Sequence, residues 1–114
     1  MIELNKHNFN DLLNDCFNRM KTAIVGIATP GCKNCEITQN YISQFQSSYP
    51  VNELEFFFID YSKGENILQH YIELYPLLEY PKTIVYYGSW HRREFLEGVI
   101  SFTELERIET KSRR

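Results

Sequence analysis

Residues 23–35 carry the pattern that decides the fold, and they read Ala23-Ile24-Val25-Gly26-Ile27-Ala28-Thr29-Pro30-Gly31-Cys32-Lys33-Asn34-Cys35. The first six residues form a compact apolar run, which is typical of a strand buried on both faces. Thr29-Pro30-Gly31 predicts the turn that ends this strand. A pair of cysteines separated by two residues therefore follows directly after a buried strand.

The segment that carries the cysteines predicts a helix. Apolar side chains recur at helical spacing from Ile37 to Phe45, and Ser47-Ser48-Tyr49-Pro50 closes the pattern. We expect the cysteines on the first turn, where unpaired amides, the helix dipole and Lys33 favour a thiolate at Cys32. Cys32 is therefore the candidate nucleophile. Cys35 lies one turn further along and is the candidate resolving thiol, which attacks a mixed disulfide formed at Cys32.

The rest of the chain alternates between strand and helix patterns. Asn8 or Asn10 is placed to cap the first helix, and Ser101-Phe102-Thr103-Glu104 has the form of a capping box before the last one. The expected elements are a strand at 2–4, a helix at 9–20, a strand at 23–28, a helix at 32–46, a strand at 54–59, a helix at 67–75 ended by Pro76, a hairpin of strands at 83–87 and 90–96, and a helix from 102. This is an α/β chain of order βαβαβαββα.

Composition predicts one domain over residues 1–114. Hydrophobic residues make up 43% of the chain, enough for a core without metals or disulfide staples. A net charge of -3 with mixed signs predicts no nucleic-acid partner. The start of the chain lacks the pattern of a signal peptide, and no apolar stretch is long enough for a membrane span. The three cysteines are an odd number, which argues against the disulfide framework of a secreted protein. We expect a cytoplasmic monomer that does not bind membranes.

A second motif, Glu79-Tyr80-Pro81-Lys82-Thr83, opens a predicted strand. Together with the cysteine motif it resembles the thioredoxin family, and the resemblance covers nearly the whole chain. It implies the thioredoxin fold, a central mixed β-sheet flanked by helices. It also implies that Pro81 is cis and packs beside the cysteines, and that the backbone of Tyr80 pairs with a bound peptide. The peptide-binding groove of the family aligns with Gly31, Tyr80, Glu97 and Gly98. The substrate-binding residues that the resemblance implies are Gly31, Tyr80, Pro81 and Gly98.

The resemblance implies a thiol-disulfide oxidoreductase that reduces protein disulfides through Cys32 and Cys35. Its partners are protein disulfide substrates and a recycling reductase or small thiol, and it needs no bound cofactor. The alternative is a thioredoxin-fold module that binds a partner at the Tyr80-Pro81 edge while its thiols turn over poorly.

Departures from the family pattern keep this alternative open. The spacer is Lys33-Asn34 where thioredoxin has Gly-Pro, and Gly31 stands where thioredoxin has Trp. Gly26 matches the position of the family's buried Asp, which helps to move the proton of the resolving cysteine. On the next strand, Phe56 matches the position of the Lys that accompanies this Asp in thioredoxin. Redox potential, substrates and turnover are therefore expected to differ from those of thioredoxin.

The remaining reactive residue types have simpler interpretations. We expect no metal, since a zinc site needs two more ligands than the cysteine pair supplies; a cluster bridged by two copies of the chain is the alternative. Cys16 lies on an apolar helical stripe and is expected in the core. Surface or capping positions are the expectation for the scattered histidines His7, His70 and His91, and a packing role for Trp90.

Overall fold

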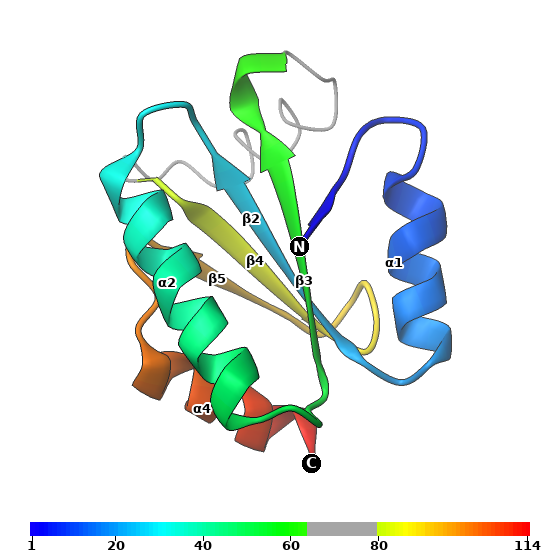
Figure 1. Ribbon diagram of the computed structural model, residues 1–114. Helices are drawn as coiled ribbons and strands as arrows, with labels where there is room; N and C mark the ends of the chain where they lie inside the picture. Colours follow the sequence, from blue (N-terminus) through cyan, green and yellow to red (C-terminus); the bar gives the residue numbers. More distant parts are fainter. Residues whose placement is uncertain (64–79) are drawn as a thin grey trace.

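The computed structural model describes residues 1–63 and 80–114, and a five-stranded mixed sheet forms its centre. The strands are β1 (Ile2–Glu3), β2 (Thr22–Ala28), β3 (Leu54–Asp60), β4 (Lys82–Tyr87) and β5 (Arg93–Glu97). They lie in the order β1-β3-β2-β4-β5 (Figure 1). β2 pairs in parallel with β3 and antiparallel with β4, so it is the central strand of the sheet.

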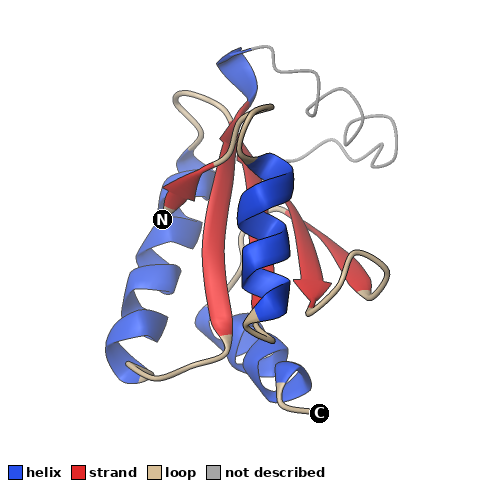
Figure 2. Cartoon of the chain, turned by 90° about the vertical axis from the view of Figure 1, so that its right-hand side faces the viewer, coloured by secondary structure: helices blue, strands red, loops and turns tan. Residues whose placement is uncertain are grey.

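Helices cover both faces of this sheet. They are α1 (Phe9–Asn18), α2 (Lys33–Ser48) and α4 (Phe102–Ser112), and a short 3-10 helix, η1 (Tyr61–Lys63), follows β3. α1 lies on one face, and α2 and α4 lie on the other (Figures 1 and 2). The strand and helix order of the described residues confirms the expected one. The helix expected at 67–75, its end at Pro76, and Glu79 lie outside the described residues.

The prediction that β2 is buried on both faces is confirmed. Its alternate residues Val25 and Ile27 pack with Leu13 of α1, whereas Ile24 packs with Phe45 of α2 on the opposite face. These side chains are all almost fully buried. Because helices cover both faces of β2, its sequence is apolar after the first residue and does not alternate with polar residues.

The predicted strand at 90–96 begins later than expected. β5 starts at Arg93, and Trp90 instead lies in the connection, where the backbone N–H of Tyr87 donates to the carbonyl of Arg92 across 2.7 Å. The Trp90 ring packs at 5.3 Å from that of Phe17, and its Nε1 donates to Asn14. Packing against α1 therefore draws Trp90 out of the ladder, and its expected packing role is confirmed.

The prediction that an Asn side chain caps the first helix is wrong. Asn8 occupies the N-cap position, but its side chain makes no capping hydrogen bond, and Asn10 lies within the helix. Asn8 Oδ1 accepts from the backbone N–H of Asn5 at 2.8 Å, and Nδ2 donates to the carbonyl of Glu3. The side chain thus joins the end of β1 to the start of α1, a local bond that competes with capping.

The cap of the last helix is confirmed and gives a stability prediction. Ser101 Oγ accepts from the backbone N–H of Glu104 at 3.2 Å. We expect Ser101→Ala to lower the free energy of unfolding by about 1 kcal/mol, because it leaves that amide without its partner. Urea denaturation measures the change. The control is Thr103→Ala on the exposed side of the same turn, for which we expect a change below about 0.5 kcal/mol. Equal effects of the two substitutions would contradict the assignment of the cap.

Candidate active site

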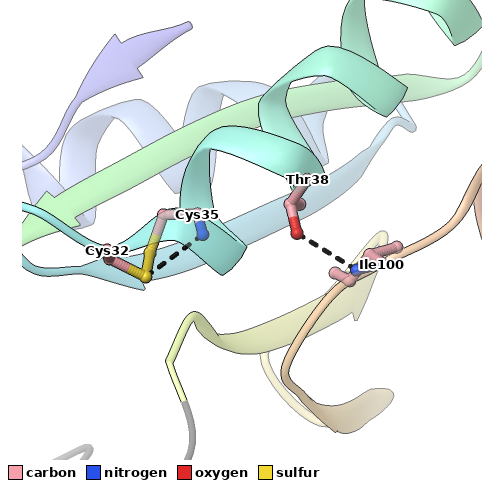
Figure 3. Close-up of a disulfide and its surroundings, with 4 residues drawn as sticks. All are labelled: Cys32, Cys35, Thr38 and Ile100. Atoms are coloured by element: carbon pink, nitrogen blue, oxygen red, sulfur yellow. Dashed lines mark hydrogen bonds between the residues drawn. A yellow bond between two sulfur atoms is a disulfide. The ribbon is translucent and has the colours of Figure 1, made fainter.

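Cys32 and Cys35 form a disulfide at the start of α2, with a Cα–Cα distance of 5.2 Å (Figure 3). Cys32 is the N-cap residue rather than part of the first turn, and its backbone is extended. Its Sγ accepts a hydrogen bond from the backbone N–H of Cys35 at 3.1 Å. The Cys35 amide, at the N-terminus of the helix, therefore donates to the sulfur of the candidate nucleophile.

The turn between β2 and α2 presents the pair to solvent. Gly31 is exposed and has a φ of +74°, a backbone conformation that glycine adopts without steric penalty. Both cysteines are half-buried, and the spacer residues Lys33 and Asn34 are exposed. A partner can thus approach the disulfide from solvent. On the other side, Cys35 faces a cavity lined by residues of the sheet.

The second predicted motif reaches the same end of the sheet. The Tyr80–Pro81 peptide bond is cis, as the family resemblance implied. The Pro81 carbonyl accepts from the backbone N–H of Gly98 at 2.9 Å, which joins two of the predicted substrate-binding residues. Tyr80 is half-buried and packs against Tyr61, and Glu97 is exposed. Pro81 and Cys35 line a common cavity, so the two motifs are neighbours in space.

This cavity lies on the inner side of Cys35 and has a volume of about 150 Å³. Gly26 and Phe56 line it, so both of these departures from the family pattern face the space beside Cys35, the candidate resolving cysteine. No carboxylate is found among the described residues that line it. Among residues 1–63 and 80–114, the cavity therefore offers Cys35 no carboxylate as a proton acceptor.

Sequence reasoning missed two threonines at this cavity. Thr38 lies one turn after Cys35, and its Oγ1 accepts from the backbone N–H of Ile100 at 3.1 Å (Figure 3). This bond ties α2 to the segment between Gly98 and α4. Thr83 is buried on β4 directly opposite Gly26. The helical spacing of Thr38, three residues after Cys35, is the signal that could have placed it on the same side of α2.

The other candidate residues lie apart from the pair. Cys16 is fully buried in the core, as expected, and burial together with the neighbouring Glu55 raises the pKa of its thiol to about 12. His7 and His91 are exposed, and His70 lies outside the described residues. Within residues 1–63 and 80–114, no group of three or more His, Cys, Asp or Glu side chains is placed to hold a metal ion, and no helix is long and apolar enough to cross a membrane.

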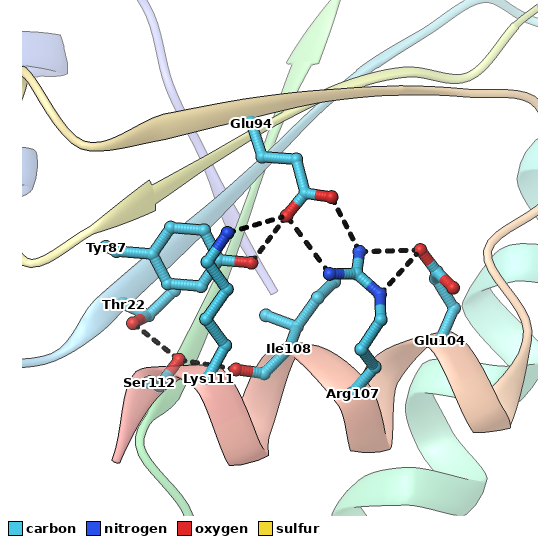
Figure 4. Close-up of polar contacts among 8 residues, drawn as sticks. All are labelled: Thr22, Tyr87, Glu94, Glu104, Arg107, Ile108, Lys111 and Ser112. Atoms are coloured by element: carbon cyan, nitrogen blue, oxygen red, sulfur yellow. Dashed lines mark hydrogen bonds and ion pairs between the residues drawn. The ribbon is translucent and has the colours of Figure 1, made fainter. Parts of the chain in front are cut away.

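A dense polar cluster at the opposite end of β2 is structural. Glu94 accepts from Tyr87 at 2.7 Å and from Arg107 at 2.7 Å (Figure 4). Burial opposes ionisation of Glu94, but these hydrogen bonds outweigh it, so its pKa is lowered. Ser112 and Thr22 are joined by a further hydrogen bond. Because Thr22 begins β2 and the cysteines follow its end, this cluster fastens α4 to the sheet away from the disulfide.

We compared the sequence and the structure of the chain with those of known proteins. No protein-family model and no curated protein sequence matches the chain. Solved structures similar to it include chloroplastic thioredoxin z, with a TM-score of 0.74 and 13% identity over 99% of this chain and 94% of that one. The Drosophila melanogaster germline-specific thioredoxin Deadhead has a TM-score of 0.70 and 13% identity over 97% of both chains. Fasciola hepatica thioredoxin has a TM-score of 0.67 and 19% identity over 98% of this chain and 99% of that one. The chain therefore has the thioredoxin fold, with a disulfide between Cys32 and Cys35 at the start of α2.

Proposed function

We propose that this protein is a thiol-disulfide oxidoreductase that reduces disulfides in other proteins. The observation that carries the proposal is the disulfide between Cys32 and Cys35, with an amide of the helix N-terminus donating to Cys32 Sγ. In the reduced protein the same amide stabilises a thiolate at Cys32, because a negative charge is favoured at a helix N-terminus. An exchangeable disulfide in this position supports redox chemistry rather than a staple, since the chain has its own extensive core.

The reaction has two exchange steps. The Cys32 thiolate attacks one sulfur of the substrate disulfide, forms a mixed disulfide and releases the first substrate thiolate. The Cys35 thiolate then attacks Cys32 Sγ, closes the Cys32–Cys35 disulfide and releases the second substrate thiolate. Two electrons have passed from the protein dithiol to the substrate. A reductase or a small thiol restores the dithiol, and the reaction requires no bound cofactor.

The substrate edge in this proposal is formed by Gly31, Tyr80, Pro81 and Gly98. The hydrogen bond between Gly98 and Pro81 fixes two of these positions relative to each other. The backbone of Tyr80 pairs with an extended substrate segment, as when a peptide adds to the edge of a sheet. Exposed Glu97 gives this edge a polar lip. We further propose that the protein acts as a monomer in the cytoplasm, where reductants keep its dithiol available.

Selective alkylation tests the roles of the cysteines. We expect a limiting amount of iodoacetamide near neutral pH to label Cys32 of the reduced protein at least about tenfold faster than the other two cysteines. Cys32 is half-buried at a helix N-terminus, whereas Cys16 is fully buried and has a raised pKa. Peptide mapping by mass spectrometry measures the three rates. Initial labelling at Cys35 or Cys16 would overturn the assignment.

A second candidate function is a binding module whose disulfide turns over poorly. The observation that favours it is the absence of a carboxylate from the described lining of the cavity beside Cys35. This module captures a partner at the Tyr80–Pro81 edge without accelerating reduction of its disulfides. A catalytic rate far above that of the free reductant supports the oxidoreductase, and tight partner binding with no such acceleration supports the module.

A further inference from the structure

The cavity beside Cys35 is a consequence of small residues on the central strand. Gly26 and Ala28 of β2 point toward α2, at the positions where larger side chains would meet the first turns of that helix. A Cβ atom placed on Gly26 finds only Thr83 Oγ1 at 3.9 Å and the Phe57 carbonyl oxygen at 4.0 Å. Both distances are ordinary contacts, so the space above Gly26 is open. Within the described part of the chain, no atom beyond Gly26 and its two chain neighbours lies closer than 3.9 Å to that Cβ position.

The walls of this space are mainly carbon. Ile24, Ile42, Phe56 and Ile100 contribute apolar surface, and they are buried. The hydroxyls of Thr38 and Thr83 are the polar side-chain groups on the buried part of the wall, and the Thr38 oxygen accepts from the backbone of Ile100. Water needs two to four polar partners to be held in a cavity, and these walls provide few. Water is therefore held weakly here, and an apolar group that displaces it gains affinity.

The cavity has the size and chemistry of a site for a small apolar molecule. Its volume of about 150 Å³ equals that of an engineered apolar cavity that binds benzene or xenon, at about 150 Å³. Met1 and Gln39, which are both exposed, belong to its lining and leave a way in from solvent. We propose that this cavity is a binding site for a small apolar molecule of about six to eight non-hydrogen atoms, held between β2 and α2 in contact with Cys35.

Binding at this site is coupled to the thiol chemistry, a step that rests on the proposed function. Cys35 is part of the cavity wall. An apolar molecule there removes water from the reduced Cys35 thiol, and loss of water disfavours the thiolate. The attack of Cys35 on Cys32 Sγ, which releases the substrate thiolate, then becomes slower. The site thus acts on the second exchange step and leaves the attack by Cys32 unchanged.

Benzene titration of the oxidised protein tests the site itself. We expect saturable shifts of the Ile24 and Ile42 methyl signals in NMR spectra, with half-saturation at about 1 mM, whereas Ile84, on the opposite face of the sheet, does not respond. Gly26→Leu fills the cavity and weakens binding at least about tenfold. If that variant does not fold, Gly26→Val serves in its place.

Thr103→Leu, which adds a similar side chain on the exposed face of α4, is the matched control and retains wild-type affinity. Absence of saturable shifts in the wild type, or unchanged affinity when Gly26 is replaced in a folded protein, overturns the site. The oxidised protein performs no exchange, so this result does not depend on the proposed function.

A single-turnover experiment tests the coupling. A mixed disulfide between Cys32 and a small aromatic thiol is allowed to resolve with and without saturating benzene. We expect benzene to slow release of the thiol at least about threefold in the wild type and to have no effect in Gly26→Leu. Equal rates with benzene bound overturn the coupling. Failure to form the mixed disulfide without benzene would instead count against the proposed function.

Discussion

A Cys35→Ser variant accumulates a mixed disulfide between Cys32 and a substrate protein, with a lifetime at least about a hundredfold longer than in the wild type. In the proposed mechanism, Cys35 of the wild type attacks within the same molecule, which gives it the large effective concentration of an intramolecular group. Serine cannot make this attack, so resolution depends on thiols from solution. Insulin serves as the disulfide substrate, and non-reducing electrophoresis with intact mass measurement follows the adduct.

Two controls define the origin of this adduct. We expect Cys32→Ser to form no comparable adduct, because the proposed nucleophile is missing. Cys16→Ser in the Cys35→Ser background leaves the adduct unchanged, because the Cys16 thiol is fully buried. Peptide mapping that locates the adduct on Cys16, or a Cys35→Ser variant that captures no substrate, would contradict the proposed division of roles.

The second large effect concerns the proton of Cys35. We expect Gly26→Asp to accelerate resolution of the mixed disulfide about ten- to a hundredfold, because a carboxylate then accepts the thiol proton directly or through water. The Cβ of the new side chain has room, and Gly26 and Cys35 line the same cavity. Burial of the carboxyl group lowers the free energy of unfolding by about 1–3 kcal/mol. Single-turnover kinetics and urea denaturation measure the two effects.

Gly26→Asn separates proton transfer from the effect of a larger side chain. Its amide is similar in size to a carboxylate but accepts no proton near neutral pH. We expect Gly26→Asn to lose stability without accelerating resolution. If the two variants resolve at the same rate as the wild type while folded, another group or bulk water already accepts the proton of Cys35.

Local patterns in the sequence were sufficient for the main elements and for the disulfide pair. β2 was predictable because a short apolar run bounded by turn residues is typical of a buried strand in an α/β chain. The Cys32–Cys35 pair was predictable because the preceding strand and following helix specify its position. The cis bond at Pro81 was predictable only from the family resemblance, since about 5–6% of X-Pro bonds in folded proteins are cis.

Tertiary contacts determine what the sequence pattern missed. Trp90 fits a strand by propensity, but the rings of Phe9 and Phe17 place it in the hairpin connection. Asn8 is a good capping residue, yet β1 supplies a competing partner for its side chain. The departure at Gly26 was visible in the sequence. The cavity above it was not, because an empty space depends on which neighbouring side chains can move into it.

The most direct test of the central claim is the catalysed reduction of insulin by dithiothreitol. The account predicts that a small amount of the folded chain accelerates the reaction at least about tenfold over dithiothreitol alone, and that Cys32→Ser abolishes the acceleration. A wild-type protein that is folded and whose Cys32–Cys35 disulfide is readily reduced, but which does not accelerate the reaction above the rate of dithiothreitol alone, would contradict the claim.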